Sequence, residues 1–309
     1  MAHAAEKTSA PWYGKISAAV AGRGSTGEAW MVSAADPERA GDVPAEPRQW
    51  RSFALAEAME DGAAPGLATD YVGAPAPEQE GEERLVVDRS PARTSYKLLR
   101  GMRETVLLAK ASADGERFDI YVGAAADSQG DGPTGAFAAM GPTFTLTASS
   151  SARTSWSLCC NRCERCEARG ARQCGRRELM RLTQYSEVVG DGSAFCMDVS
   201  LPPQRPDGST EVSCQRCGGA PEALDVALTV RRPKWNARQK SLTLDFHGRC
   251  SMSSAKNFQL EDPRAPKAGP GKYKLLFGKI AEQRYVLDYR HPLGMVQAFA
   301  AALSTSHWK

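Results

Sequence analysis

The last twenty residues, RHPLGMVQAFAAALSTSHWK, constrain the fold more than any other part of the sequence. Between Pro292 and Leu303, Gln297 is the only residue with a polar side chain. A surface helix has one apolar stripe and one polar face, whereas a helix that is apolar all round is buried on every side. The segment is too short to cross a bilayer, which takes about 20 apolar residues. We therefore expect a central helix around which the rest of the chain wraps.

From about residue 94 the sequence shows the short alternating runs that are typical of β-strands. Runs such as ETVLLAKAS, RFDIYVGA, SLTLDFH and RYVLDYR are rich in β-branched and aromatic residues, and Gly, Asp or Pro bounds them. Roughly ten or more such runs follow one another. An antiparallel sheet of this size removes its exposed edges by closing on itself. The sequence therefore predicts a mainly β fold, a closed antiparallel β-barrel around a central hydrophobic C-terminal helix.

Residues 1–92 are predicted to form an acidic N-terminal arm that is largely irregular, or ordered only by a partner. This segment is rich in Ala, Gly, Pro and Glu, and such segments bury too little apolar surface to offset chain entropy. Residues 1–90 carry eight Lys and Arg and fifteen Asp and Glu, a net charge of −7, so the rest of the chain carries +10. A basic domain at 93–309 indicates an anionic partner, unless both parts are ordinary solvated surface.

Two segments of the arm contain apolar residues in a polar context. RQWRSFALAEAMED has Trp50, Phe53, Ala54 and Ala58 at helical spacing, and PWYGKI has two aromatic residues and an isoleucine. Both segments suit docking on a protein partner, or they form only transient local structure.

The C-terminal part of the chain resembles the tubby C-terminal domain. The match is clearest in WNARQKSLTLDFHGRCSMSSAKNFQL and FGKIAEQRYVLDYRHPLGMVQAFAAALS, which lie between Trp235 and Ser304. Weaker similarity covers ETVLLAK to PTFTLTA and RRELMRLTQYSEV to MDVSLPP. The resemblance implies a closed twelve-stranded barrel threaded by the C-terminal helix. It also implies a binding module for phosphoinositide headgroups without enzymatic activity, and a role as an adaptor at membranes, notably in cilia.

The resemblance further implies where a headgroup would bind. In membrane-binding members the cations follow the strand that corresponds to ETVLLAK, since a multiply phosphorylated headgroup needs several converging Lys and Arg side chains. In this chain ASADGERFDIYV replaces the dense basic run, and GAFAAM stands where the family has GKLRSN. Two to four lost contacts of about 1.5–3 kcal/mol each weaken such a site by orders of magnitude. The remaining candidates for phosphoinositide binding are Lys97, Arg100, Arg103, Lys110 and Arg117.

A second candidate surface is the basic segment VRRPKWNARQK, which holds five cations and no acid. It suits phosphates or an acidic protein surface such as that of tubulin, or it is an ordinary solvated loop. No motif that reads a nucleic-acid sequence is present, so only non-specific binding of nucleic acid is left as a distant alternative. The candidates for partner binding in this loop are Arg231, Arg232, Lys234, Arg238 and Lys240.

The nine cysteines indicate a reducing compartment. They are an odd number in a chain without a recognisable secretory signal, which favours free thiols or metal ligands over disulfides. No stretch is long and apolar enough for a transmembrane helix. We therefore expect an intracellular protein, neither secreted nor membrane-spanning, in the cytoplasm or in a cilium or flagellum.

Two Cys-x-x-Cys pairs predict one structural zinc ion. They lie in two segments that are not typical of the family, a Cys/Arg-rich insertion near 151–178 and a second Cys-containing loop near 203–220. Paired thiolates at this spacing suit tetrahedral Zn²⁺, which would clip the two loops together. The alternatives are free thiols or another pairing, such as Cys160 with Cys163. The candidate metal ligands are Cys163, Cys166, Cys214 and Cys217.

Two functions of different classes follow from these observations. No Gly-rich phosphate loop, HExxH motif or nucleophile elbow is present, so we expect neither an enzyme nor a small-molecule substrate. The first function is an adaptor or scaffold for ciliary, axonemal or trafficking proteins, which the missing headgroup cations favour. The second is a phosphoinositide-binding membrane adaptor with a weakened headgroup site, which the resemblance favours. The ciliary placement comes from the resemblance alone.

Overall fold

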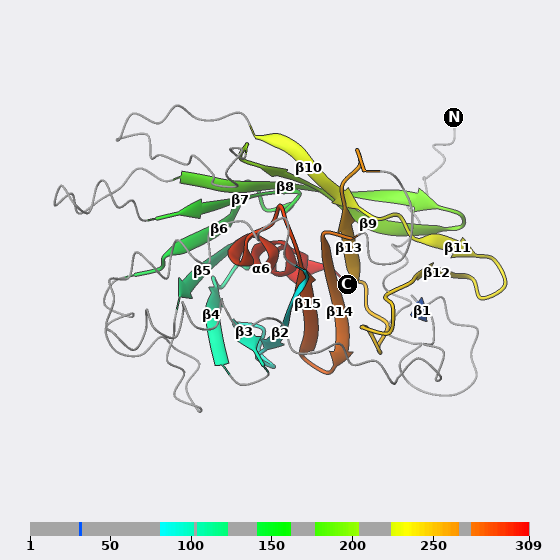
Figure 1. Ribbon diagram of the computed structural model, residues 1–309, viewed down its shortest axis with the longest axis horizontal. Helices are drawn as coiled ribbons and strands as arrows, with labels where there is room; N and C mark the ends of the chain where they lie inside the picture. The colour runs from blue at the N-terminus through cyan, green and yellow to red at the C-terminus, as the bar shows by residue number, and fades with distance from the viewer. Residues whose placement is uncertain are drawn as a thin grey trace, which may run out of the picture.

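A closed barrel of twelve strands forms the body of the protein, and one α-helix lies inside it (Figure 1). The computed structural model describes the backbone of residues 31–32 and residues 81–101, 104–122, 141–161, 177–203, 224–265 and 273–308. Around the barrel the strand order is β10-β13-β14-β15-β2-β3-β4-β5-β6-β7-β8-β9, and every strand is antiparallel to its neighbours. The predicted fold class is confirmed.

Eight barrel strands follow one another in chain order, and four more close the barrel. The eight are β2 (Glu83–Arg89), β3 (Ser95–Arg100), β4 (Glu104–Ala111), β5 (Arg117–Val122), β6 (Phe144–Ala148), β7 (Ser155–Cys160), β8 (Arg177–Val189) and β9 (Gly192–Leu201). The four are β10 (Asp225–Val230), β13 (Phe258–Glu261), β14 (Leu275–Ala281) and β15 (Arg284–Tyr289). The remaining elements are β1 (Met31–Val32), β11 (Lys234–Asn236), β12 (Ser241–Leu244), α6 (Met295–Ser304) and the 3-10 turn η4 (Thr305–His307).

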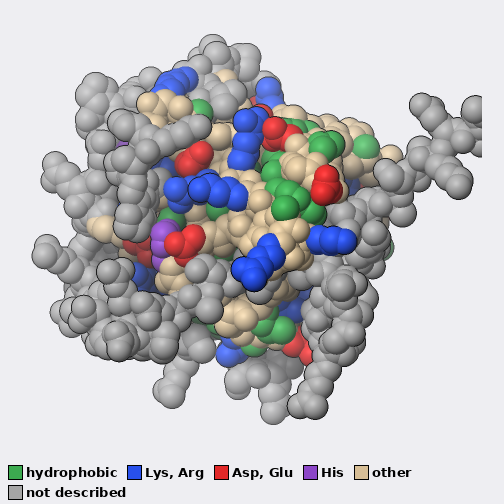
Figure 2. All heavy atoms as spheres, turned by 90° about the vertical axis from the view of Figure 1, so that its right-hand side faces the viewer, with side chains coloured by type: hydrophobic (Ala, Val, Ile, Leu, Met, Phe, Trp, Pro, Cys, Tyr) green, Lys and Arg blue, Asp and Glu red, His purple; other side chains and the backbone are tan. Residues whose placement is uncertain are grey.

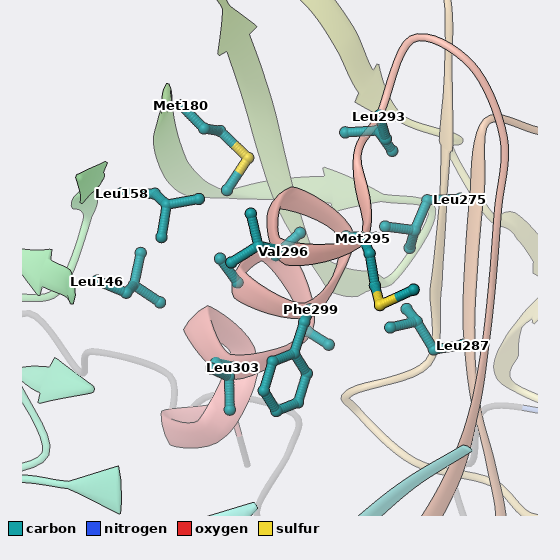
Figure 3. Close-up of a cluster of buried hydrophobic side chains, with 14 of the residues drawn as sticks. Leu146, Leu158, Met180, Leu275, Leu287, Leu293, Met295, Val296, Phe299 and Leu303 are labelled. Atoms are coloured by element: carbon teal, nitrogen blue, oxygen red, sulfur yellow. The ribbon is translucent and has the colours of Figure 1, made fainter. Parts of the chain in front are cut away.

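The helix α6 fills the barrel. All of its residues are buried, because apolar side chains on every side of the helix meet the inward faces of the surrounding strands. Figure 3 shows Val296 and Phe299 of α6 among leucine and methionine side chains of the barrel wall. Among the described residues, no helix is long and apolar enough to cross a membrane.

The polar groups at both ends of α6 have partners. The Gln297 amide donates to the backbone oxygen of Leu179 on β8 at 2.8 Å, and its side-chain oxygen accepts from the Gly294 N–H at 2.8 Å. At the other end, Lys256 Nζ donates to the carbonyl oxygens of Thr305 and Ser306 at 2.9 Å each, and to that of Trp308. A cation at these carbonyls complements the negative end of the helix dipole.

An outer layer lies against the outside of the barrel. It consists of β11, β12 and the loop that leads to β13 (Figure 1). Trp235 and Leu242 of the β11–β12 hairpin pack on the outward-facing Ala194 and Cys196 of β9. The turn between β8 and β9 fits against this hairpin because Gly190 has no side chain, and a Cβ there would lie 2.2 Å from the Trp235 ring.

Three elements differ from the sequence-based expectation. Strand β2 lies within the segment predicted to be the arm, so the barrel begins before residue 93. Strand β7 lies within the segment predicted to be an insertion at 151–178, and it carries Cys159 and Cys160 into the barrel wall. Strand β12, predicted to be a barrel strand, belongs to the outer layer. The alternating pattern of β12 predicts only that one face of the strand is buried. Packing in the outer layer buries one face just as a place in the barrel wall would, so the pattern does not distinguish the two.

Candidate functional site

Two of the candidates for headgroup binding, Lys97 and Lys110, lie on the outward face of neighbouring strands. Lys97 is opposite Leu108 on β4, and Lys110 is opposite Ser95 on β3. The two lysines are therefore diagonal neighbours, a relation that places Cα atoms about 7–8 Å apart. Within the part of the chain that the structure describes, neither lysine has an ion pair. On the other side, each lysine lies opposite an aspartate, Lys97 opposite Asp88 on β2 and Lys110 opposite Asp119 on β5.

Two further candidates have acidic partners. Arg100 lies 3.2 Å from Glu83 on the adjacent β2. Arg117 donates two hydrogen bonds to Asp119 on its own strand, from Nε at 2.9 Å and from Nη2 at 2.7 Å. A carboxylate beside each guanidinium reduces its attraction for a phosphate. Arg103, the fifth candidate, lies outside the described residues.

The turn between β4 and β5 holds an acid where the family resemblance implies a basic run. Asp114 accepts hydrogen bonds from the Ser112 hydroxyl at 2.5 Å and from the Glu116 N–H at 2.9 Å. These hydrogen bonds, that from Ser112 first, lower the pKa of Asp114, which therefore stays ionised. Arg153, from the turn between β6 and β7, donates to the backbone oxygen of Asp114. The turn therefore carries one ionised carboxylate, with the Arg153 guanidinium beside it, in place of a cluster of cations.

Sequence reasoning missed one exposed cation near the two lysines. Arg93 lies in the turn between β2 and β3, where its N–H donates to the Ser90 oxygen at 2.9 Å. This turn adjoins the end of β4, because the N–H of Ala111 donates to the Thr94 oxygen at 2.8 Å. Arg93 was missed because β2 was assigned to the arm, so no turn was predicted at this position. Recognition of ERLVVDR as a strand would have found it.

The basic loop is only partly available to a partner. Arg231 lies 3.5 Å from Glu261, and Arg232 lies 3.0 Å from Glu187. The side chains of Lys234, Arg238 and Lys240 are exposed and have no ion pair among the described residues. Figure 2 views the side on which β11 and β12 lie in Figure 1, and it shows Lys and Arg scattered among acidic and apolar side chains.

The four cysteines proposed as zinc ligands lie outside the described residues, so zinc binding stays a prediction. The described cysteines Cys159, Cys160, Cys196 and Cys250 form no disulfide. Burial raises the pKa of Cys196 to about 12 and that of Cys250 to about 11, so both thiols stay protonated. Neither thiol is therefore an activated nucleophile.

Comparison with known proteins places the similarity in the second half of the chain. Residues 180–307 match the model of the Tub family, a range that runs from β8 through α6. The chain is 32% identical over 149 residues to Tubby protein homolog 1 of Caenorhabditis briggsae, which covers 43% of this chain and 34% of that protein. It is 33% identical over 139 residues to Tubby-related protein 1 of Mus musculus, and this match covers 42% of this chain and 25% of that protein. It is 41% identical over 80 residues to Protein king tubby of Drosophila sechellia, and this match covers 26% of this chain and 17% of that protein. The matches thus span about a third or less of each relative.

Proposed function

Because this chain is a tubby-like protein of the Tub family, we propose that its barrel is a non-enzymatic adaptor that binds protein partners on its outer surface. The observation that carries the proposal is the turn between β4 and β5. Where the family resemblance implies a cluster of cations, this turn holds Asp114 in ionised form, and the neighbouring Arg117 is paired with Asp119. A surface of this kind favours a protein partner over a multiply charged headgroup.

The exposed cations of the β11–β12 hairpin support an acidic protein partner. Lys234, Arg238 and Lys240 project from an outer layer that is packed firmly on the barrel. Unpaired cations on a fixed support attract acidic surfaces at long range and orient them. We place this adaptor inside the cell, with partners of the ciliary, axonemal or trafficking class, on the strength of the family resemblance.

Phosphoinositide binding is the second candidate function. Among the described residues, Lys97 and Lys110 are diagonal neighbours without an ion pair, although Asp88 and Asp119 lie opposite them on the adjoining strands. Arg93 lies in the turn beside them. Three cations at one end of the barrel favour a weakened headgroup site. This site would act mainly through charge, since Arg100 and Arg117, the side chains suited to bidentate phosphate contacts, already contact carboxylates.

One co-sedimentation experiment separates the two functions. The full chain is mixed with vesicles that contain or lack phosphatidylinositol bisphosphate, at low and high salt, and with microtubules as an acidic protein surface. We expect no more than a twofold effect of the lipid. We also expect salt-sensitive binding to microtubules that Lys234→Glu with Lys240→Glu reduces at least tenfold. Lipid-dependent binding that Lys97→Gln with Lys110→Gln abolishes would instead make the membrane function the correct one.

We also propose that one structural zinc ion joins the two Cys-containing loops. The first loop joins the end of β7 to the start of β8, where Cys160 pairs with Arg177. The second loop leaves the end of β9, which lies beside the start of β8 because Ser200 pairs with Arg181. This supports Cys163, Cys166, Cys214 and Cys217 as a closed tetrahedral set. Elemental analysis of the purified chain is expected to find one zinc per chain, and none in Cys163→Ser with Cys214→Ser. A zinc-free chain whose melting temperature a chelator leaves unchanged would refute this proposal.

A further inference from the structure

Strand β12 of the outer layer has two edges, and each is paired with a different segment. On one edge it pairs antiparallel with β11, with Lys234 opposite Thr243 and Asn236 opposite Ser241. On the other edge it pairs in parallel with β1, a two-residue strand that belongs to the N-terminal arm. Figure 1 shows β1 beside β12, outside the barrel. The arm thus adds a third strand to a two-stranded sheet.

The edge that accepts β1 is held in place by the barrel. Leu242 of β12 is buried against β9, and Phe246, just beyond the strand, is buried against Leu276 and Val286 on the outside of β14 and β15. The hairpin therefore keeps its position whether or not another strand is paired to it. A fixed edge strand with unpaired N–H and C=O groups is a template for an additional strand.

The present occupant of this edge pairs with it through the backbone. Among the described residues, Met31 and Val32 lie opposite Thr243 and Leu244 of β12. A backbone hydrogen bond contributes about 0.5–1.5 kcal/mol net, so one strand can be exchanged for another that forms an equal or longer ladder. A segment that pairs along more of β12 would displace it.

Charge indicates the kind of segment that this edge accepts. In sequence, residues 24–38 surround β1 and contain three acids, Glu28, Asp36 and Glu38, and the nearest cations, Arg23 and Arg39, stand at the two ends of this segment. The hairpin that receives β1 carries the exposed Lys234 and Lys240. The sequence segment that contains β1 thus has the charge opposite to that of the hairpin, which favours this pairing over one with a basic segment.

We propose that the edge of β12 that pairs with β1 is a strand-acceptor site for an extended acidic peptide, and that the chain's own N-terminal arm is its resident occupant. A partner protein gains this edge only when its own extended segment replaces Met31 and Val32. The arm therefore acts as an internal competitor for a docking position on the outer layer. This site requires neither a headgroup nor zinc, and it stands whether the adaptor function or the membrane function is correct.

Hydrogen exchange of the full chain tests the resident pairing. In Val32→Pro, the proline lacks an N–H and fixes φ near −65°, away from the φ of about −120° of a parallel strand, so it disfavours the ladder. We expect peptides that cover Ser241–Leu244 to exchange at least tenfold faster than in the wild type, with unchanged exchange in β14 and β15. The matched control is Ala45→Pro, which introduces proline into the same arm outside β1 and should leave β12 unaffected.

A fluorescent peptide of residues 24–38 tests the acceptor site in trans. We expect it to bind full-length Val32→Pro at least tenfold more tightly than the wild type, whose edge is occupied. The same peptide with proline at position 32 should bind neither protein. Equal exchange of β12 in wild type and Val32→Pro, or an unmodified peptide that binds neither protein, would overturn the proposal. These readouts are independent of vesicle and microtubule binding, so this proposal and the proposed function can fail separately.

Discussion

Ala300→Asp is expected to abolish the folded barrel. Ala300 lies in the middle of α6 with none of its surface exposed, and the wall around it is apolar. An ionised carboxylate at this position would have no partner, and its transfer from water costs several kcal/mol or more. Domains of this size are stable by only about 5–15 kcal/mol. The variant therefore loses most or all of its stability, although the substitution adds few atoms.

Thermal melts followed by circular dichroism, together with the soluble yield, measure this effect. Val188→Asp is the matched control, since it introduces the same charge on β8 at a side chain that is 78% exposed. A surface substitution of this kind changes the stability by about 0.5 kcal/mol. We expect a cooperative melt for Val188→Asp and none for Ala300→Asp. A cooperative melt of Ala300→Asp at the wild-type temperature would disprove the burial of α6.

The barrel and its central helix could be predicted because both leave a local pattern in the sequence. An apolar run that lacks a polar face has few places in a folded protein other than the centre, and alternating runs predict strands one by one. Strand β2 was not predicted because its apolar core is only three residues, Leu85 to Val87, between charged residues. What makes it a strand is its pairing with β15, about two hundred residues away, and such pairing leaves no local signal.

The candidate site could be predicted only in part, again because strand pairing leaves no local signal in the sequence. The residues Lys97 and Lys110 were named as cations, but their diagonal placement depends on the register of β3 and β4. The pairing of Arg100 with Glu83 depends on a strand that sequence reasoning did not find. By contrast, Arg117 and Asp119 stand two residues apart on one strand, and alternation alone places them on the same face. That neutralisation could have been predicted from the sequence.

Arg249→Met is expected to cost about 3–5 kcal/mol of stability, the second largest effect, because it leaves a buried charge without its partner. The partner is Asp288 on β15, whose side chain has no exposed surface. Arg249 donates to both of its carboxylate oxygens, from Nε at 2.5 Å and from Nη2 at 2.6 Å. Burial raises the pKa of Asp288 even with the arginine present. Without Arg249 the pKa rises further, so the folded state binds a proton more tightly than the unfolded state. The variant therefore loses more stability as the pH rises above the ordinary value for Asp, about 4.

Urea unfolding at pH 5 and pH 8 measures the loss, and Arg284→Met is the matched control. Arg284 contacts Asp88 with the same two-point geometry, at 2.6 and 2.8 Å, but the two side chains are 39% and 31% exposed. A pair in water contributes about 0–1 kcal/mol, so the control should change little at either pH. Equal losses in the two variants would contradict the role given to burial.

Arg249→Met combined with Asp288→Leu separates the buried charge from the lost contact. If the unpaired carboxylate causes the loss, the double variant should recover most of the stability, because apolar replacement of a buried ion pair is often nearly neutral. Arg249 lies in the loop of the outer layer, whereas Asp288 faces outward from the barrel, so the pair also fastens one to the other. The edge of β12 belongs to that layer. Hydrogen exchange at Ser241–Leu244 should therefore quicken in the double variant even after its stability has recovered, because a leucine contact cannot fix the loop as the bidentate pair does.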